Sequence, residues 1–386
     1  MKVALIHDYL TQRGGAERVF KLLCSFFPQA DIYSSVYDPN NTVDFDGRSI
    51  NTTFLQNLPG TKKSFRLFAP VYYSAFRSLD LQEYDLILTS TSSFAKGVKK
   101  KPGAMHICFC HNVTRFLWDT RTYLQEYTGI RKLSPLIEQI LQSMRQQDLQ
   151  YAKEPDLYIA NSTTVAERVR QIYHRKALAI NYPINTDKFI FSDKKEDYYL
   201  ISSRTISYKR LDIAVETFNW LGLPLIIIGD GPERKRLEKS ALSNIKFLGY
   251  VDDQWRTHLM AKAKAVIVTA LEDYGLVPIE ANASGTPVIA YGAGGALDTQ
   301  VPGKTGILFK PQTPEGLQLA VKEMENREWN YGAIRKHAID NFSESVFFRQ
   351  IVEVIREFCG QSVLDKLTIN QKHFKDERVL QSKVEV

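Results

Sequence analysis

Long apolar runs and clustered cysteines are both absent from this chain. No stretch is apolar over enough residues to span a bilayer, which excludes a bundle of membrane helices. The first ten residues, MKVALIHDYL, hold one lysine and a short apolar run, so we expect a first strand there and not a signal peptide. The four cysteines are scattered; Cys108 and Cys110 share one face of an expected strand, which suits neither a disulfide nor a metal site. We therefore expect a cytoplasmic protein.

An excess of acidic residues is lacking as well. The net charge of +7 arises entirely in the first half, with 24 Lys+Arg against 17 Asp+Glu in residues 1–190 and 26 against 26 in residues 191–386. A basic half is typical of a protein with an anionic partner, such as nucleic acid, an acidic substrate or an anionic lipid, but it also occurs as an ordinary solvated surface. A length of 386 residues favours two domains.

Alternating strand and helix patterns run through both halves. Strands are expected at 3–6, 32–36, 86–89, 106–110 and 157–160, then at 198–202, 223–228, 245–248, 265–268 and 287–290. Helices are expected at 16–27, 209–220, 253–263, 314–325, 331–341 and 344–358, with another beginning at Pro232. Residues 182–197 are polar and without periodicity, as in a linker. The pattern predicts an α/β protein with two doubly wound parallel sheets.

Residues 269–283, TALEDYGLVPIEANA, are the stretch around which a site is expected. They follow the apolar strand 265–268, and Pro278 suits the first turn of a helix. Glu272 then lies at the carboxyl end of a strand, and Glu280 lies eight residues later in the following helix. Ligands of open α/β sheets bind at such an edge. The two carboxylates are therefore candidate site residues.

Two cations and several glycines are expected at sheet edges of the same kind. Arg204 follows strand 198–202 and Lys209 opens the next helix, and both side chains bind phosphate oxygens well. Glycine turns at 14–15, 229–231 and 292–295 let a backbone approach a ligand, although each alone also fits an ordinary tight turn. The first of these turns lacks the GxGxxG spacing, so a nicotinamide dinucleotide is not predicted.

Together these pieces resemble family four of the retaining glycosyltransferases, from about residue 2 to residue 355. The matching segments are Ser203-Arg204 with Lys209-Arg210, GDGPE at 229–233, FLGYV at 247–251, the E-x7-E pair around Tyr274-Gly275-Leu276, GTPV at 285–288, Gly294-Gly295, GGAE at 14–17 and Asn161-Ser162. The resemblance implies the GT-B fold, in which two Rossmann-like doubly wound domains face a cleft and a C-terminal helix crosses back to the first domain.

The domains that we expect are an acceptor-binding domain at 1–190, a nucleotide-sugar-binding domain at 191–342, a crossover helix at 343–360 and a polar tail at 361–386. The resemblance implies that Arg204 and Lys209 neutralise the diphosphate of the donor, that Glu272 holds hydroxyls of the transferred sugar and that Glu280 accepts from ribose hydroxyls. The other residues expected to bind the donor are Gly14, Gly15, Ser203, Gly229, Val251, Asp253, Tyr274, Gly275, Leu276 and Val277.

The identity of the donor depends on one side chain. Asp253 is expected to accept from two donors of guanine, and GDP-mannose is therefore the first choice, ahead of UDP-hexoses. Alternatively, Asp253 caps the helix that starts there. The expected partners are a nucleotide sugar and a saccharide or lipid-linked acceptor, without nucleic acid.

His111 begins an H-x3-R-x2-W-D pattern similar to that of mannosyl- and related hexosyltransferases, with Val113 where those often have proline. The resemblance implies that His111 contacts the donor sugar near its reacting carbon, and that Arg115 and Asp119 shape the acceptor side. The expected reaction is a same-face displacement in which the leaving phosphate deprotonates the acceptor, without metal or cofactor. A nucleotide-sugar epimerase of the same fold is the alternative enzyme, and a binding protein without catalysis is the third interpretation.

Two further segments have more than one interpretation. Residues 62–77 mix cations with aromatic side chains, and Lys99-Lys100-Lys101 follows. Such composition fits a surface for anionic headgroups on the inner face of a membrane, but we favour a core-packed helix with a basic outer face. Asp44-Phe45-Asp46 spells the metal-binding D-x-D of another glycosyltransferase fold, and its turn-rich context favours chance.

Overall fold

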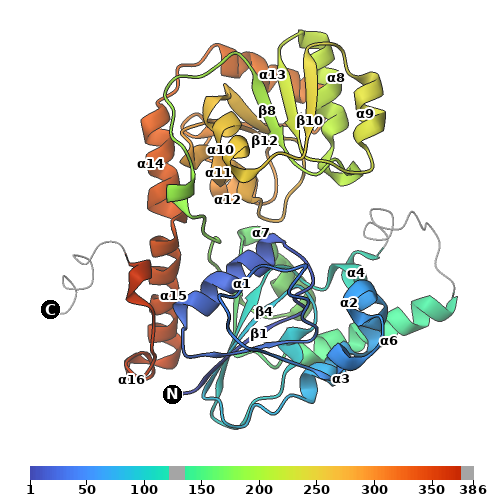
Figure 1. Ribbon diagram of the computed structural model, residues 1–386, viewed down its shortest axis with the longest axis vertical. Helices are drawn as coiled ribbons and strands as arrows, with labels where there is room; N and C mark the ends of the chain where they lie inside the picture. Colours follow the sequence, from blue (N-terminus) through green and yellow to red (C-terminus); the bar gives the residue numbers. More distant parts are fainter. Residues whose placement is uncertain (121–134, 375–386) are drawn as a thin grey trace, which may run out of the picture. The chain divides into compact units, whose positions relative to one another are not determined.

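The chain folds into two compact units, each built on a parallel β-sheet. The computed structural model describes residues 1–120 and 135–374. Unit 1 comprises Met1–Tyr182 and the chain from Phe347 onward, and unit 2 comprises Pro183–Val346 (Figure 1). Within the described ranges, no helix is both long and apolar enough to cross a membrane.

Unit 1 contains a seven-stranded sheet in the order β3-β2-β1-β4-β5-β6-β7, with every pairing parallel. The strands are β1 Val3–His7, β2 Asp31–Ser34, β3 Ile50–Thr52, β4 Leu86–Thr91, β5 Met105–Cys110, β6 Leu157–Ala160 and β7 Ala177–Ala179. The strand order reverses direction between β1 and β4, which makes the carboxyl ends of these two strands the topological switch point of the sheet.

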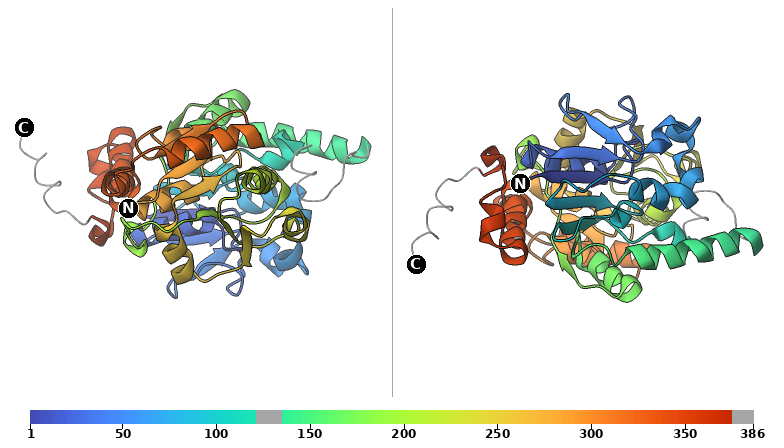
Figure 2. Two further views of the ribbon diagram at one scale, coloured as in Figure 1. Left: turned by 90° about the horizontal axis from the view of Figure 1, so that it is seen from above. Right: turned by 90° about the horizontal axis from the view of Figure 1, so that it is seen from below.

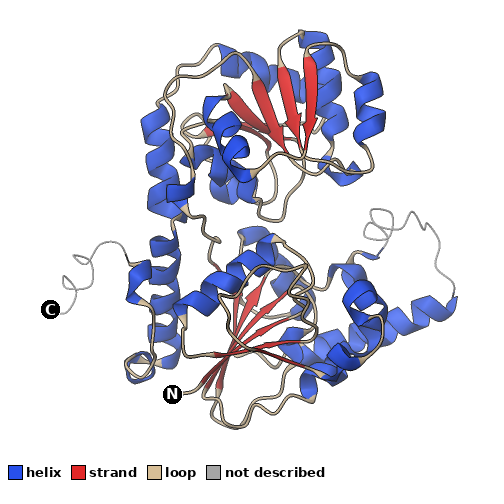
Figure 3. Cartoon of the chain, in the orientation of Figure 1, coloured by secondary structure: helices blue, strands red, loops and turns tan. Residues whose placement is uncertain are grey.

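Helices cover both faces of this sheet (Figure 3). The α-helices are α1 Gly15–Phe26, α2 Thr61–Ser64, α3 Tyr72–Arg77, α4 Arg115–Trp118, α6 Pro135–Tyr151, α7 Thr163–Arg168, α15 Glu344–Cys359 and α16 Gln361–Leu364. The chain also forms the 3₁₀ segments η1 Phe54–Asn57, η2 Phe65–Val71, η3 Ala95–Gly97 and η7 Gln371–His373 and the π-helical turn η4 Val169–Tyr173. The N-terminal end of α6 extends away from the sheet in all three views (Figures 1 and 2). α15 starts in unit 2 and continues into unit 1, where Phe348 stacks on Phe26 of α1 with 4.1 Å between ring centroids.

Unit 2 contains a six-stranded parallel sheet in the order β10-β9-β8-β11-β12-β13. Its strands are β8 Tyr199–Ser202, β9 Leu225–Ile228, β10 Ile245–Gly249, β11 Ala265–Val268, β12 Val288–Tyr291 and β13 Gly306–Phe309. Its helices are α8 Leu211–Leu221, α9 Arg234–Ser240, α10 Asp253–Lys262, α11 Leu276–Ala283, α12 Ala296–Thr299, α13 Pro314–Glu325 and α14 Tyr331–Phe342, with turns η5 Thr186–Lys188 and η6 Ser207–Lys209. Here the order reverses between β8 and β11.

The predicted fold class, with two doubly wound parallel sheets, is confirmed. All ten predicted strands are present, and three more, β3, β7 and β13, are added at the sheet edges. The segment expected as one helix over 62–77 is instead three short pieces, α2, η2 and α3. In α3, Tyr72, Tyr73, Ala75 and Phe76 are buried, as expected of a core-packed helix, whereas Leu67 of η2 is 81% exposed.

Candidate functional site

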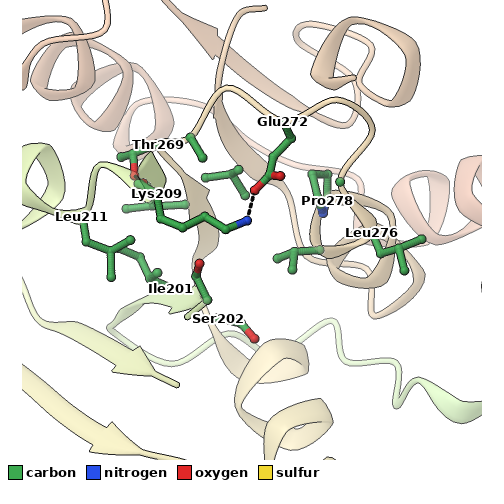
Figure 4. Close-up of a pocket in the computed structure, with 14 residues that line it drawn as sticks. Ile201, Ser202, Lys209, Leu211, Thr269, Glu272, Leu276 and Pro278 are labelled. Carbon is green, nitrogen blue, oxygen red and sulfur yellow. Dashed lines mark hydrogen bonds and ion pairs between the residues drawn. The ribbon is translucent and has the colours of Figure 1, made fainter. Parts of the chain in front are cut away.

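A pocket of about 170 Å³ lies at the switch point of unit 2 (Figure 4). The carboxyl ends of β8 and β11 form one part of its wall, and the N-terminus of α11 forms another. The lining residues are Ile201, Ser202, Ser203, Lys209, Leu211, Ile267, Val268, Thr269, Ala270, Glu272, Gly275, Leu276, Val277 and Pro278. The first N–H groups of a helix have no partner within the helix and favour anions. The pocket is thus suited to a ligand with negative charge.

Lys209 and Glu272 extend toward each other across this pocket and form an ion pair (Figure 4). Their side chains are 16% and 22% exposed. Burial alone would lower the pKa of the Lys209 ammonium, but the Glu272 carboxylate outweighs burial and holds this pKa above its ordinary value. Lys209 is therefore charged at neutral pH, and Thr269 Oγ1 fixes its backbone by donating to its carbonyl at 2.8 Å.

Arg204 supplies a second cation close to the pocket. It lies two residues after the end of β8, and its side chain is exposed. Within residues 1–120 and 135–374, its guanidinium has no hydrogen-bond or ion-pair partner. All five donors of a planar fork are thus available for a phosphate group.

Glycine loops fix the backbone that carries Glu272. Gly295 donates its N–H to the Glu272 carbonyl at 2.9 Å, and a Cβ on Gly295 would lie 2.1 Å from the Tyr274 carbonyl oxygen. A Cβ on Gly229 would lie 2.0 Å from the Ser203 carbonyl oxygen. Gly295 thus brings its loop against the loop of Glu272, and Gly229 brings its loop against Ser203 at the end of β8, so the immediate role of both glycines is to position the pocket wall.

Glu280 is held by an arginine that the sequence analysis missed. Arg256 Nη1 donates to Glu280 Oε2 at 2.6 Å, and Arg256 Nε lies 3.5 Å from Asp253 Oδ1. The Asp253 side chain is 86% exposed. The N-cap of α10 is Asp252, which accepts from the Trp255 N–H at 2.7 Å, so the alternative in which Asp253 caps this helix is wrong.

The first unit holds the other predicted site residues. His111 follows β5; its Nε2 bonds to Ser90 Oγ at 2.7 Å and its ring packs edge-on against Tyr182. Burial, together with the nearby His7, lowers the pKa of His111 to about 3, so its imidazole is neutral at physiological pH. Arg115 and Asp119 pair with each other across α4 at 3.6 Å.

The structure therefore gathers only part of the predicted set in one pocket. The predicted residues that line the pocket are Ser203, Lys209, Glu272, Gly275, Leu276 and Val277. The predicted residues of the same unit that lie outside the lining are Arg204, Gly229, Val251, Asp253, Tyr274 and Glu280. The predicted residues of unit 1 are Gly14, Gly15, His111, Arg115 and Asp119. Thr269 and Pro278 also line the pocket and were not predicted as site residues, although both belong to the stretch 269–283. No sequence signal linked Arg256 to Glu280.

The D-x-D triplet, the cysteines and two residues of the lysine run all have defined structural surroundings. Asp46 of the D-x-D triplet pairs with Lys21 at 2.9 Å, and Phe45 between the two acids is buried. All four cysteines are free. Lys100 pairs with Asp156, and Lys101 pairs with Asp85 at 2.8 Å.

Comparison with known proteins gives the family context of unit 2. Residues 184–342 match the family Glycosyl transferases group 1. The lipopolysaccharide core biosynthesis glycosyltransferase LpsE of Rhizobium meliloti is 24% identical over 340 residues, 84% of this chain and 88% of its own length. An uncharacterized glycosyltransferase of Methanocaldococcus jannaschii is 25% identical over 45% of this chain, and a Thermus thermophilus glycogen synthase is 36% identical over 34%. The matches span half of the archaeal relative and 31% of the synthase.

Solved structures share the fold over nearly the whole chain. Anabaena HepE in complex with UDP matches with a TM-score of 0.66 at 21% identity, covering 93% of this chain and all of HepE. Sucrose-phosphate synthase of Thermosynechococcus elongatus matches with a TM-score of 0.67 at 18% identity, covering 93% of this chain and 99% of the synthase. These likenesses concern the fold, and with the two parallel sheets they show the GT-B architecture.

Proposed function

We propose that this GT-B chain, whose residues 184–342 form a Glycosyl transferases group 1 domain, transfers a hexose from a nucleotide sugar to a saccharide or lipid-linked saccharide, with retention at the anomeric carbon. The observation that carries the proposal is the pocket in which Lys209 and Glu272 meet the N-terminus of α11. Its ammonium and helix N–H groups suit a diphosphate, and its carboxylate suits sugar hydroxyls.

The proposed reaction needs no protein nucleophile. The bond between the anomeric carbon and the donor phosphate breaks, the acceptor oxygen bonds to the same face of that carbon, and the acceptor proton passes to the departing phosphate. Negative charge then builds on the leaving diphosphate, where Lys209, Arg204 and the α11 N–H groups stabilise it. Glu272 orients the sugar and keeps Lys209 in place.

GDP-mannose is the favoured donor and a UDP-hexose is the second candidate. The exposed Asp253 carboxylate supports the first, because it can accept from two donors of guanine, whereas uracil offers one. HepE, which shares the fold, forms complexes with UDP and with UDP-glucose, and this supports the second. The neighbouring Glu280, fixed by Arg256, would hold the ribose of either nucleotide.

A thermal-shift panel of GDP-mannose, UDP-glucose and ADP-glucose tests the donor. A ligand at a hundred times its Kd stabilises by about 2.7 kcal/mol, which should raise Tm by about 5–10 °C. We expect GDP-mannose to give the largest shift, and Asp253→Asn to remove its advantage over UDP-glucose. Asp340→Asn, at an exposed ion pair on α14, is the control. A larger shift with UDP-glucose in the wild type would select the second donor, and no shift with any nucleotide sugar would contradict the proposal.

An epimerase is distinguished by incubation with the donor alone. A 2-epimerase converts a nucleotide sugar without an acceptor, whereas the proposed transferase leaves the sugar configuration of the remaining donor unchanged. Epimerised donor in the nuclear magnetic resonance spectrum would therefore favour the alternative enzyme.

A surface of unit 1 supports a lipid-linked acceptor. From Gly47 to Leu79 the sequence has no Asp or Glu and five Lys or Arg. On this segment Phe54, Leu58, Leu67 and Val71 are exposed apolar side chains, and Lys62 and Arg66 are exposed cations. Apolar side chains beside unbalanced cations suit an anionic bilayer surface.

Vesicle binding tests this surface. We expect the protein to sediment with vesicles containing 30% anionic lipid at low salt and to be released at high salt, because surface charges are screened. Arg66→Glu with Leu67→Ser should weaken binding by at least about tenfold, since each cation near the surface contributes about 1 kcal/mol. Leu319→Ser, at a 65% exposed leucine on α13 of unit 2, is the matched control. Absence of binding by the wild type would contradict the membrane assignment.

A further inference from the structure

A buried chain of polar side chains lies at the switch point of unit 1, next to His111. His7 ends β1, and Ser90 of β4 is its partner in register. The Ser90 hydroxyl bonds to His7 Nδ1 at 3.0 Å and to His111 Nε2 at 2.7 Å. On its other side, His7 Nε2 lies 3.8 Å from Glu17 Oε1. All four side chains are buried, and neither Ser90 nor Glu17 is more than 1% exposed.

The single proton of Ser90 gives this chain a direction. If both imidazoles donated to its oxygen, the buried hydroxyl proton would have no acceptor among the described residues, which is unfavourable. Ser90 therefore donates to one ring and accepts from the other. The tautomer of His7 therefore determines the tautomer of His111.

Glu17 determines the direction. Its carboxylate accepts from the Gly14 N–H at 2.9 Å and from the Gln12 amide at 3.0 Å. Burial alone would raise the pKa of Glu17, but the His7 ring, the Gln12 amide and the backbone N–H of Glu17 hold this pKa below its ordinary value, so the group is an anion. A neutral His7 must then turn its N–H, and not its lone pair, toward this anion. His7 Nδ1 is left to accept from Ser90, and Ser90 accepts from His111 Nε2–H.

We propose that Glu17, His7 and Ser90 are positioning residues that fix His111 in its Nε2–H tautomer, so that Nδ1 presents a lone pair to a hydroxyl of the bound sugar. The tautomer follows from unit 1 alone, and only the sugar contact rests on the proposed function. His111 Nδ1 makes no hydrogen bond with the residues that the structure describes. The neutral ring that the tautomer requires is provided by burial, which lowers the pKa of His111 to about 3.

The tautomer can be read directly in the full chain without ligand. Two-bond proton–nitrogen spectra of protein labelled with ¹⁵N in its histidines distinguish Nε2–H from Nδ1–H, and the signal lost in His111→Gln assigns His111. We expect Nε2–H in the wild type and a mixture of tautomers in Ser90→Ala. Thr89→Ala is the matched control, because Thr89 is the adjacent residue of β4 and bonds to His106 Nε2 at 2.9 Å. It should change the His106 signal and leave His111 as it is.

Two results would overturn the proposal: an Nδ1–H tautomer of His111 in the wild type, as an imidazolium at His7 would impose, or an unchanged His111 tautomer in Ser90→Ala. Should Ser90→Ala fail to fold, Glu17→Gln keeps the shape of the side chain and removes the anion, and it should likewise mix the tautomers. An unmixed Nε2–H tautomer there would overturn the role of Glu17.

Activity separates this inference from the proposed function. We expect Ser90→Ala to lower kcat by about tenfold, the effect of one hydrogen bond, with the donor KM nearly unchanged and Thr89→Ala at wild-type activity. If His111 has the expected tautomer but His111→Gln retains full transfer activity, the sugar contact is refuted, whereas the positioning of His111 by Glu17, His7 and Ser90 stands. If the wild type shows the Nδ1–H tautomer of His111 and normal transfer activity, the positioning of His111 by Glu17, His7 and Ser90 is refuted, whereas the proposed function stands.

Discussion

Lys209→Met should lower kcat/KM for transfer by about 10²–10³, the loss typical of removing one group that stabilises developing charge. The variant keeps most of the apolar side chain and removes the ammonium that lies in the pocket at the switch point of unit 2. Because charge on the leaving diphosphate grows toward the transition state, we expect kcat to fall more than KM rises. Release of nucleoside diphosphate measures the effect.

A double variant distinguishes two ways in which Lys209 could act. If the ammonium only holds Glu272, then Lys209→Met in a Glu272→Gln background should cost nothing further. If it stabilises the diphosphate itself, most of its effect should persist in that background. Lys336→Met, which breaks an exposed ion pair on α14, controls for the loss of a lysine from unit 2. Full activity of Lys209→Met would contradict the proposed mechanism.

The central architecture was predictable because its signals are local. Buried parallel strands such as 265–268 are short continuous apolar runs, and residues at their carboxyl ends reach the same edge of the sheet. This reasoning placed Glu272 at the carboxyl end of one strand and Lys209 at the start of the helix after another, and the structure joins the two in one ion pair. The edge strands β3 and β7 were missed because they have three residues each and little apolar surface to bury.

The contacts that fix side chains were not predictable from spacing. Ser90 lies 83 positions from His7, and Arg256 lies 24 positions from Glu280. Neither pair has a periodicity that relates its members, since their approach depends on the register of two strands or on the packing of two helices. Glu17 was visible as part of GGAE, but its interaction with His7 required the packing of α1 against β1. Sequence therefore located the candidate groups, whereas their partners required tertiary structure.

The helix that carries the residues predicted to face the acceptor depends on a buried ion pair of unit 1. Lys96 Nζ lies 2.7 Å from Asp148 Oδ1, and the two side chains are 2% and 0% exposed. Asp148 also accepts from Thr114 Oγ1 at 2.8 Å and from Trp118 Nε1 at 2.6 Å. Thr114 and Trp118 are the N-cap and the last residue of α4, the helix that begins at Arg115. The carboxylate of α6 thus anchors both ends of the helix that carries the predicted acceptor contacts.

Asp148→Asn should destabilise unit 1 by about 3–5 kcal/mol, because it leaves the Lys96 ammonium buried without a counter-charge. Native-state hydrogen exchange in peptides of β5 and α6 measures the loss. The double variant Lys96→Met with Asp148→Leu should lower the free energy of unfolding by less than the sum of the two single changes, since no buried charge then remains unpaired. Lys101→Met, at a pair with Asp85 whose side chains are 29% and 44% exposed, should cost at most about 1 kcal/mol. Additive losses in the double variant would contradict this account.

The same pair predicts how acid affects unit 1. Burial alone would raise the pKa of Asp148, but Lys96 and the hydrogen-bond donors around it hold this pKa below its ordinary value of 3.8. A carboxyl with a lowered folded-state pKa contributes stability above its unfolded value and loses that contribution as the pH falls through its folded value. The wild type should therefore lose part of its stability advantage over Asp148→Asn only when the pH falls below about 3.8. A constant difference in exchange protection between the two proteins from pH 6 to pH 2.5 would show that the charge of Asp148 does not contribute.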